Sequence, residues 1–203
     1  MPTSIERKEA RREQLRQQVR IEILQACAQL IAQKGVVNLS MDEVASLSGL
    51  SKGSLYNYFS NRDELIWVVV DTYRQHFLEQ ADPILNDISR PFPERFSQLV
   101  DLTLLSLESE AGLVGVLDYF EEQISKARYA ESPMLTYVKQ FHASFAPFFA
   151  EGIANASVKG KDPMELSVTF VTMAYHLFEY GRLGFLQGGR EQHRAGLLSL
   201  FLL

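Results

Sequence analysis

The sequence has very little cysteine and no long hydrophobic stretch. Cys27 is the single cysteine among 203 residues, so an intrachain disulfide is impossible and a disulfide-stabilised secreted scaffold is excluded. The longest apolar stretches, Ile66–Val70 and Leu197–Leu203, are far shorter than the roughly 18 residues that a membrane-spanning helix needs. The first residues are charged and include no apolar segment of the kind found in secretory signals. We therefore expect a cytoplasmic protein that does not enter the membrane.

The motifs of common catalytic and metal sites are also missing. His76, His142 and His176 are widely separated, and the sequence contains no His-Glu-x-x-His, Gly-x-Ser-x-Gly or phosphate-binding glycine loop. His176, Glu179 and Tyr180 can meet on one helix face, which is a weak signal for catalysis. We expect a protein that is not an enzyme and that needs neither a cofactor nor a metal.

Charge is distributed unevenly along the chain. The net charge is −5, yet residues 1–62 hold nine Lys and Arg against six Asp and Glu, while the remainder carries −8. Binding to a polyanion depends on the local potential, so the acidic total does not exclude a nucleic-acid partner. Ordinary scatter in composition is the alternative explanation of this basic first third.

Apolar residues recur at helical spacing almost everywhere, and no sustained alternation typical of strands is present. The pattern predicts an all-α protein of about nine helices, with domains at 1–62 and 63–203. A first helix is expected to end at Lys34-Gly35, and Ser40 and Glu43 form the pattern of a capping box. The expected helices after the first are 41–47, 51–59, Asp63–Ala81 closed by Asp82-Pro83, Glu94–Glu110, Leu113–Arg128, Pro133–Ala154, Asp162–Leu186 and Arg190–Leu203.

Two short helices joined by a glycine-containing turn occupy residues 40–59, as in a helix-turn-helix. At about 100° per residue, Ser51, Leu55 and Phe59 form the buried side of the second helix. Gly53 and Asn57 then point outward, with Tyr56 and Ser54 beside them. An ordinary helical turn with a polar solvent face is the alternative. In a helix-turn-helix, the second helix enters the DNA major groove.

The segment from Ser40 to Leu65, with Leu50-Ser-Lys-Gly-Ser-Leu-Tyr56 at its centre, resembles the DNA-binding signature of the TetR family of bacterial transcriptional regulators. The resemblance implies a cytoplasmic homodimer that binds double-stranded DNA at a palindromic operator, a repressor function and release by a small-molecule effector. It places a DNA-binding head before a larger helical body that binds the effector. The alternatives are a transcriptional activator, or an architectural DNA-binding protein without a ligand.

The resemblance also implies roles for individual residues. Base readout is expected at Gly53, Ser54 and Asn57, since an Asn side chain can pair with adenine. Phosphate contacts position a protein on DNA without reading its sequence. The residues expected to lie at phosphates or at the rim of the groove are Ser40, Lys52, Tyr56, Tyr58 and Arg62.

The N-terminal arm, Glu6–Arg20, mixes acidic and basic residues at three- and four-residue steps. This spacing predicts a helical extension linked by Glu–Arg pairs. The alternative is that Arg11, Arg12 or Arg16 contacts a neighbouring phosphate or the minor groove.

The body is rich in aromatic residues, which suit a hydrophobic or aromatic effector. Core packing is the alternative for each of them. Dimerisation is expected through the last two helices, because Asp162–Leu186 is apolar on more than one side and the chain ends in an apolar segment. The predicted effector contacts are Trp67, Tyr73, Phe77, Tyr119, Phe120, His142, Phe145, Phe149, Met173 and His176.

Overall fold

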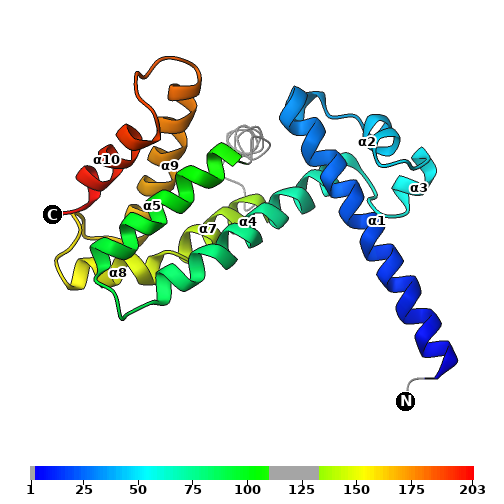
Figure 1. Ribbon diagram of the computed structural model, residues 1–203, viewed down its shortest axis with the longest axis horizontal. Coiled ribbons are helices and arrows are strands. Elements are labelled where there is room, and N and C mark those ends of the chain that lie inside the picture. The colour runs from blue at the N-terminus through cyan, green and yellow to red at the C-terminus, as the bar shows by residue number, and fades with distance from the viewer. Residues whose placement is uncertain (1–2, 110–132) are drawn as a thin grey trace. The chain divides into compact units, whose positions relative to one another are not determined.

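The computed structural model describes residues 3–109 and 133–203, and within these ranges the fold is all-α (Figure 1). The described residues form nine α-helices and one 3-10 turn, beside a single isolated bridge between Val158 and Leu202. The predicted fold class is therefore confirmed. The expected helix Leu113–Arg128, with Tyr119 and Phe120, lies outside the described residues. None of the described helices is long and apolar enough to span a bilayer.

The chain divides into two compact units, Met1–Tyr73 and Arg74–Leu203. Helix α4, Arg62–Asn86, contributes residues to both of them. The first unit contains, before α4, helix α1 (Ser4–Lys34), the 3-10 turn η1 (Val36–Asn38), α2 (Met41–Leu47) and α3 (Lys52–Tyr56).

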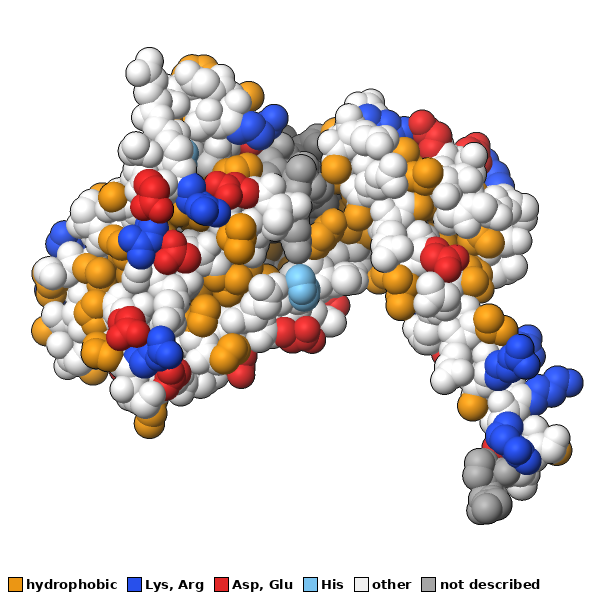
Figure 2. All heavy atoms as spheres, viewed as in Figure 1, with side chains coloured by type: hydrophobic (Ala, Val, Ile, Leu, Met, Phe, Trp, Pro, Cys, Tyr) orange, Lys and Arg blue, Asp and Glu red, His pale blue; other side chains and the backbone are white. Residues whose placement is uncertain are grey.

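Helix α1 begins well before the apolar pattern that predicts it. Thr3 and Glu6 form a capping box at its N-terminus, and Gly35 ends it with a φ of 78°. Every residue from Thr3 to Gln18 is exposed, so this part of the helix is an arm without tertiary packing. Lys and Arg side chains gather along the arm in Figure 2. The predicted helical extension is confirmed.

The predicted Glu–Arg pairs of the arm are not among the contacts of the described residues, so this prediction is wrong. Glu13 and Glu22 accept hydrogen bonds from Gln17 and Gln18, at 2.8 and 3.0 Å. Glu6 is used in the N-terminal cap, where it accepts from the backbone N–H of Thr3 at 2.5 Å. Glu6 and Glu13 of the arm therefore accept from local amide donors instead of guanidinium groups.

The core of the first unit packs α1 against α2, α3 and the start of α4. Its fully buried members include Ile23 and Cys27 of α1, Val44 of α2, Leu55 of α3 and Leu65 of α4. Burial raises the pKa of the Cys27 thiol to about 12, so this side chain is a protonated core residue rather than a nucleophile.

The second unit is built from the rest of α4 and five further described helices. They are α5 (Phe92–Ser109), α7 (Pro133–Ala143), α8 (Ala146–Ala154), α9 (Pro163–Arg182) and α10 (Arg190–Phe201). Helix α9 contacts α5, α7, α8 and α10 and so lies at the centre of this unit (Figure 1).

Phenylalanine rings form the core of the second unit. Phe92 stacks on Phe148 with ring centroids 4.5 Å apart, and Phe96 lies 5.5 Å from both Phe170 and Phe201. A Cβ at Gly152 would lie 2.5 Å from Phe92 Cζ, so only glycine fits beneath this stack. Gly181 allows a similar approach of α9 to α10, because a Cβ there would lie 2.7 Å from His193 Cε1.

Three predicted helix boundaries in the second unit are wrong. Helix α4 continues through Pro83 to Asn86. The proline removes one backbone donor, but the packing of Ile84 and Leu85 on the core offsets this loss. The expected helix Pro133–Ala154 is divided at Ser144 and Phe145, where Phe145 is fully buried. Helix α9 ends at Arg182, before the turn at Gly184, whose φ is 78°.

A buried arginine, Arg95 of α5, contacts both α4 and α8, which no sequence pattern predicts. The Arg95 side chain is 1% exposed and donates to the carbonyl oxygens of Leu85 and Arg90 at 2.9 and 3.1 Å. It also pairs with the Glu151 carboxylate, and its guanidinium carbon lies 5.3 Å from the centroid of the Phe148 ring. Arg95 therefore caps the C-terminal end of α4 and fixes it to its neighbours.

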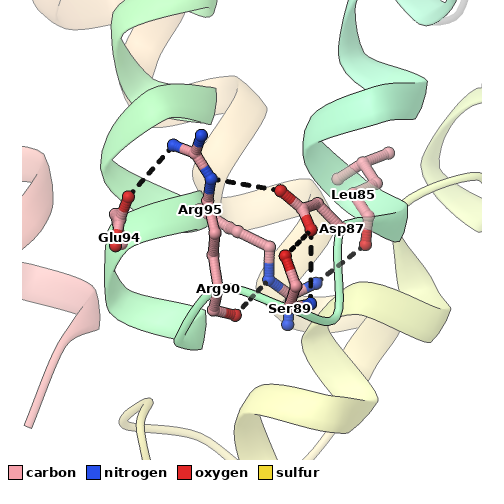
Figure 3. Close-up of polar contacts among 6 residues, drawn as sticks. All are labelled: Leu85, Asp87, Ser89, Arg90, Glu94 and Arg95. Carbon is pink, nitrogen blue, oxygen red and sulfur yellow. Dashed lines mark hydrogen bonds and ion pairs between the residues drawn. The ribbon is translucent and has the colours of Figure 1, made fainter.

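Polar contacts order the loop between α4 and α5 as well. Asp87 accepts from the Ser89 hydroxyl, which lowers the pKa of the Asp87 carboxyl, and Arg90 lies 3.1 Å from this carboxylate (Figure 3). These groups are solvated, so they shape the loop more than they stabilise the unit.

Candidate DNA-binding interface

Helices α2 and α3 are joined by a tight turn that is fixed by local hydrogen bonds. Gly49 has a φ of 69°, which favours glycine, and the backbone N–H of Leu50 donates to the Ala45 carbonyl at 2.8 Å. Ser51 then caps α3, since its hydroxyl oxygen accepts from the backbone N–H of Ser54 at 3.1 Å. The turn and the cap together set the direction in which α3 leaves α2.

The cap of α2 differs from the predicted capping box. The Ser40 hydroxyl oxygen accepts from the backbone N–H of Asp42 at 3.3 Å, and the Glu43 carboxylate pairs with Lys34 of α1. The Glu43 carboxylate thus pairs with a cation instead of accepting the expected hydrogen bond from the backbone N–H of Ser40. The side chain of Ser40 is half-buried at the N-terminus of α2.

The outer surface of α3 is small and polar. Gly53, Tyr56 and Asn57 are exposed, while Leu55 and Phe59 are fully buried against the core. The predicted buried side is wrong at Ser51, which is exposed. This surface carries amide, hydroxyl and aromatic groups with little bulk around them.

The second helix is shorter than predicted. It ends at Tyr56 instead of Phe59, and Asn57 is its C-cap residue. The Ser54 side chain is half-buried, and its hydroxyl oxygen lies 2.8 Å from that of Ser51, within the cap. The structure thus brings Gly53, Tyr56 and Asn57 together as an open surface and turns Ser54 toward its own helix terminus.

Lys52 and Arg62 are held by other parts of the protein. Lys52 Nζ lies 2.8 Å from Asp42 Oδ1, and the hydrogen bond to Asp42 raises the pKa of the exposed Lys52. The half-buried Arg62 donates through Nε to the Leu39 carbonyl at 3.0 Å and through Nη2 to that of Val36. The Arg62 guanidinium therefore fixes the turn before α2 to the start of α4. Tyr58, which lies between Lys52 and Arg62 in the sequence, is half-buried.

Most of the predicted effector contacts that the structure describes belong to packed clusters. Phe77 and Phe145 lie with ring centroids 6.2 Å apart, and the fully buried Phe149 packs on Phe96 and Phe170. Met173 lines a cavity of about 260 Å³ beside the loop before α9. Trp67 and Tyr73 belong to the first unit.

The two predicted histidines lie in different surroundings. His142 Nδ1 is 3.2 Å from the hydroxyl oxygen of the fully buried Ser167, and burial lowers the pKa of His142. His176 stacks on Tyr180 with ring centroids 5.6 Å apart. Neither residue lines the described cavities.

A cavity of about 330 Å³ lies between α4 and α8, and the sequence prediction missed the residues around it. Amphipathic spacing marks Leu78, Leu85 and Phe148 only as core residues, which is why pattern alone did not single them out. The cavity is lined by Leu78, Asp82, Leu85, Asn86, Ile88, Ser144, Pro147, Phe148 and Glu151.

A short capped helix that presents an exposed polar face after a glycine turn, supported by α1, is the helix-turn-helix of a DNA-binding transcriptional regulator. Residues 23–67 match the family model described as "Bacterial regulatory proteins, tetR family". This match confirms the predicted resemblance of the DNA-binding segment to the TetR family.

Two transcriptional regulators are similar to this chain over most of its length. An uncharacterised HTH-type transcriptional regulator of Bacillus subtilis, YhgD, is 26% identical over 153 residues, which cover 70% of this chain and 72% of the relative. The HTH-type transcriptional repressor KstR2 of Mycolicibacterium smegmatis is 23% identical over 157 residues, which cover 75% of this chain and 73% of the repressor.

A solved structure shows the same fold across both units. AibR in complex with isovaleryl coenzyme A and operator DNA gives a TM-score of 0.68 at 19% identity. The match covers 90% of this chain and 98% of AibR.

Proposed function

We propose that the chain is a repressor that binds a palindromic operator as a homodimer and is released by a small hydrophobic or aromatic effector. The observation that carries this proposal is the exposed surface of Gly53, Tyr56 and Asn57 on α3. A surface with so little bulk allows the backbone of α3 to approach the floor of a major groove. The similarity to the repressor KstR2 and to AibR, which was solved with operator DNA, supports the same function.

Different residues on this surface have different roles in the proposal. Asn57 reads a base, because an exposed amide at the end of α3 carries both a donor and an acceptor. Tyr56, which is 43% exposed, donates its hydroxyl to a phosphate, and Lys52 neutralises another phosphate after exchanging its pairing with Asp42. Arg62 is assigned to holding the turn before α2, in place of the expected phosphate contact.

Dimerisation is proposed through α9 and α10. Arg190 and Arg194 of α10 pair with Glu108 and Asp101 of α5, at 3.1 and 2.7 Å, which turns both cations toward α5. The outer face of α10 beyond its first turn is then uncharged. Apolar side chains that remain 38–77% exposed along these two helices and the segments after them include Met164, Val168, Tyr180, Leu183, Leu200 and Leu203. Such a surface is costly in water and suits a second copy of the chain.

The effector is proposed to bind the second unit in the cavity of about 330 Å³ between α4 and α8. This cavity contacts the C-terminal half of α4, the helix that also supplies Leu65 to the core of the DNA-binding unit. An effector that prefers one position of α4 would shift the population of DNA-binding dimers, since a ligand acts only through its different affinities for two states. AibR, which is similar in fold, was solved in complex with isovaleryl coenzyme A, so a small molecule can bind within this fold.

The proposed DNA binding is tested by selecting sites from a random duplex library with the purified chain, followed by titration of the selected duplex. We expect an inverted repeat with half-sites about one DNA turn apart, or roughly 34–36 Å. Asn57→Ala should relax one base position by about 1–3 kcal/mol, while Tyr56→Phe should weaken all sequences equally. Selection of no sequence, or of sites without twofold symmetry, would contradict the proposal.

The dimer is tested with two surface leucines of equal exposure. Leu200 on α10 is 49% exposed and Leu105 on α5 is 51% exposed. Light scattering coupled to size-exclusion chromatography should give a dimer for the unmodified chain and for Leu105→Arg. Leu200→Arg should give a monomer, because it places a charge in the proposed interface. A monomeric unmodified chain would refute this part of the proposal.

A further inference from the structure

The loop that joins α9 to α10 exposes a cluster of apolar side chains on a defined turn. Phe185 is 79% exposed, and Leu183 and Leu186 are exposed beside it. The backbone N–H groups of Phe185 and Leu186 both donate to the Tyr180 carbonyl, at 2.9 and 3.2 Å. The Phe185 ring packs edge-on to the Tyr180 ring, with centroids 6.0 Å apart. The turn therefore holds an aromatic ring outside the core, where it is costly in water.

The other end of the same two helices contains a cavity of about 260 Å³. Its apolar lining comes from Leu166 and Met173 of α9 and from Leu200 and Phe201 of α10, with Thr169 beside them. Leu166 and Phe201 are buried, so the floor of the cavity is apolar. An apolar protein cavity of about 150 Å³ is large enough to bind benzene. This cavity therefore has room for a phenyl ring.

Backbone contacts give this cavity a fixed frame. Val158 forms a bridge with Leu202, and the backbone N–H of Lys159 donates to the Phe201 carbonyl at 2.8 Å. The Lys159 side chain also donates to the Ser199 carbonyl at 2.7 Å. In Figure 1 the segment before α9 meets the C-terminus at one end of the helix pair, and the loop between α9 and α10 lies at the other end. The cavity is thus formed within one chain and needs little ordering to accept a side chain.

The outer stripe of α9 places the loop and the cavity on opposite sides of its midpoint. Thr172, His176 and Tyr180 follow one another along this stripe at four-residue steps. Thr169 at the cavity lies seven positions before His176, or about 10 Å along the helix. Tyr180 lies about 6 Å beyond His176, with the Phe185 ring against it. A twofold axis near His176, with two antiparallel copies of α9, brings the loop of each copy to the cavity of the other.

Charged side chains favour antiparallel over parallel copies of α9. Lys161 and Glu165 lie at the rim of the cavity, and Arg190 and Glu191 follow the loop at the start of α10. Within the part of the chain that the structure describes, Lys161, Glu165 and Glu191 are exposed and form no ion pair. Antiparallel copies bring these two groups of mixed sign together, so Lys161 can pair with Glu191. Parallel copies place each charge beside its own equivalent, and like charges across an interface are costly.

We propose that the Phe185 ring of each subunit occupies the cavity beside Leu166 and Thr169 of the other subunit. This inference rests on the proposed dimer through α9 and α10, and it specifies the direction and the anchor of that dimer. Aromatic side chains that fill a pocket carry much of the binding energy of an interface. Twofold symmetry buries two such anchors in each dimer. The cavity between α4 and α8 stays open for the effector.

The direction is tested with a double variant, Thr169→Cys with Phe185→Cys. Helix α9 separates the two positions by about 20 Å within one chain, whereas a disulfide needs Cα atoms within about 7 Å. Oxidation, followed by alkylation of free thiols, should therefore give a covalent dimer of the double variant on a non-reducing gel. Each single variant should give none, and neither should the unmodified chain, whose Cys27 is fully buried.

A covalent dimer from Phe185→Cys alone would show that the two loops meet each other, which overturns the proposal. A covalent dimer from Thr169→Cys alone would overturn it in the same way. So would a double variant that is dimeric by light scattering but forms no disulfide. If the unmodified chain is monomeric, the proposed dimer itself fails.

The anchor is tested by sedimentation equilibrium. Phe185→Ala should raise the dissociation constant of the dimer about a hundredfold, or about tenfold for each of the two anchors. Val37→Ala is the matched control, because Val37 is 75% exposed and belongs to the first unit, and it should change this constant by less than about twofold. Circular dichroism verifies that both variants are folded. If the unmodified chain dimerises and the two variants dissociate equally, the role of Phe185 is refuted.

Discussion

The Nε of Arg62 donates a hydrogen bond to the carbonyl oxygen of Leu39 at 3.0 Å, which joins the start of α4 to the turn before α2. Replacing Arg62 by Met would remove this donor and the one directed at Val36. We expect a loss of about 1–3 kcal/mol in the free energy of unfolding, because partly buried acceptors are left without partners. Denaturant unfolding of the purified variant measures this loss.

Lys52→Met is the matched control for Arg62, since Lys52 is exposed and pairs with Asp42 at the surface. It should leave stability almost unchanged and should reduce the salt slope of DNA binding by about one. Arg62→Met should leave that slope unchanged. A reduced slope without a loss of stability would assign Arg62 to a phosphate after all.

Gly53→Ala separates the stability of α3 from its fit to DNA. A Cβ at Gly53 meets no atom within 4 Å, and alanine is up to about 1 kcal/mol more favourable than glycine in a helix. The variant should therefore unfold at a slightly higher denaturant concentration. It should nonetheless bind the selected duplex about tenfold more weakly, equivalent to about 1.4 kcal/mol, because the added methyl group keeps the backbone away from the groove. Unchanged affinity would contradict the close approach.

Gly152→Ala provides the contrast, because its Cβ would lie 2.5 Å from Phe92 Cζ in the core of the second unit. This variant should be destabilised by about 1–3 kcal/mol through overpacking. Comparing the DNA affinities of Gly53→Ala and Gly152→Ala shows whether a loss of affinity comes from the position of the methyl group on α3 or from a general loss of stability.

His142 gives the second unit a dependence on pH. Burial lowers the pKa of His142 in the folded state, so below its ordinary value of about 6.5 the unfolded chain binds a proton that the folded chain resists. The contribution of His142 to stability is therefore complete above this pH and decreases as the pH falls from 7 toward 5. Urea unfolding across this range should show a smaller decrease for His142→Gln than for the unmodified chain. An equal decrease would assign the effect to other groups.

Arg95→Met should strongly destabilise the second unit. The side chain is 1% exposed and serves two carbonyl oxygens and Glu151, so its removal leaves several polar groups without a partner. Loss of one partner of a buried pair costs about 3–5 kcal/mol, and the 39% exposure of Glu151 places the expected loss near 3 kcal/mol. Arg90→Met, which removes only surface pairs, should cost less than about 1 kcal/mol by the same unfolding measurement.

The helix-turn-helix could be predicted because its signals are local. Ser51 is followed by the residues it caps, and the spacing of Leu55 and Phe59 alone indicates which side of α3 is buried. The outward direction of Gly53 and Asn57 follows from the same spacing. Nothing within a few residues of Arg62, however, reveals that carbonyl groups more than twenty positions earlier would engage it.

The second unit could be predicted less well because its boundaries depend on tertiary packing. Pro83 is a strong local signal for a helix end, yet burial of Ile84 and Leu85 keeps α4 continuous beyond it. A fully buried Phe145 at the break between α7 and α8 cannot be told from a helical core residue by spacing. The cavity between α4 and α8 likewise combines residues more than fifty positions apart.

The contact of Gly181 with His193 sets the distance between the two helices proposed for dimerisation. A larger side chain at position 181 would collide with the His193 ring, so glycine here allows α9 and α10 to lie close together. In a dimer formed through these helices, as proposed, this close contact would couple a movement of α9 to α10.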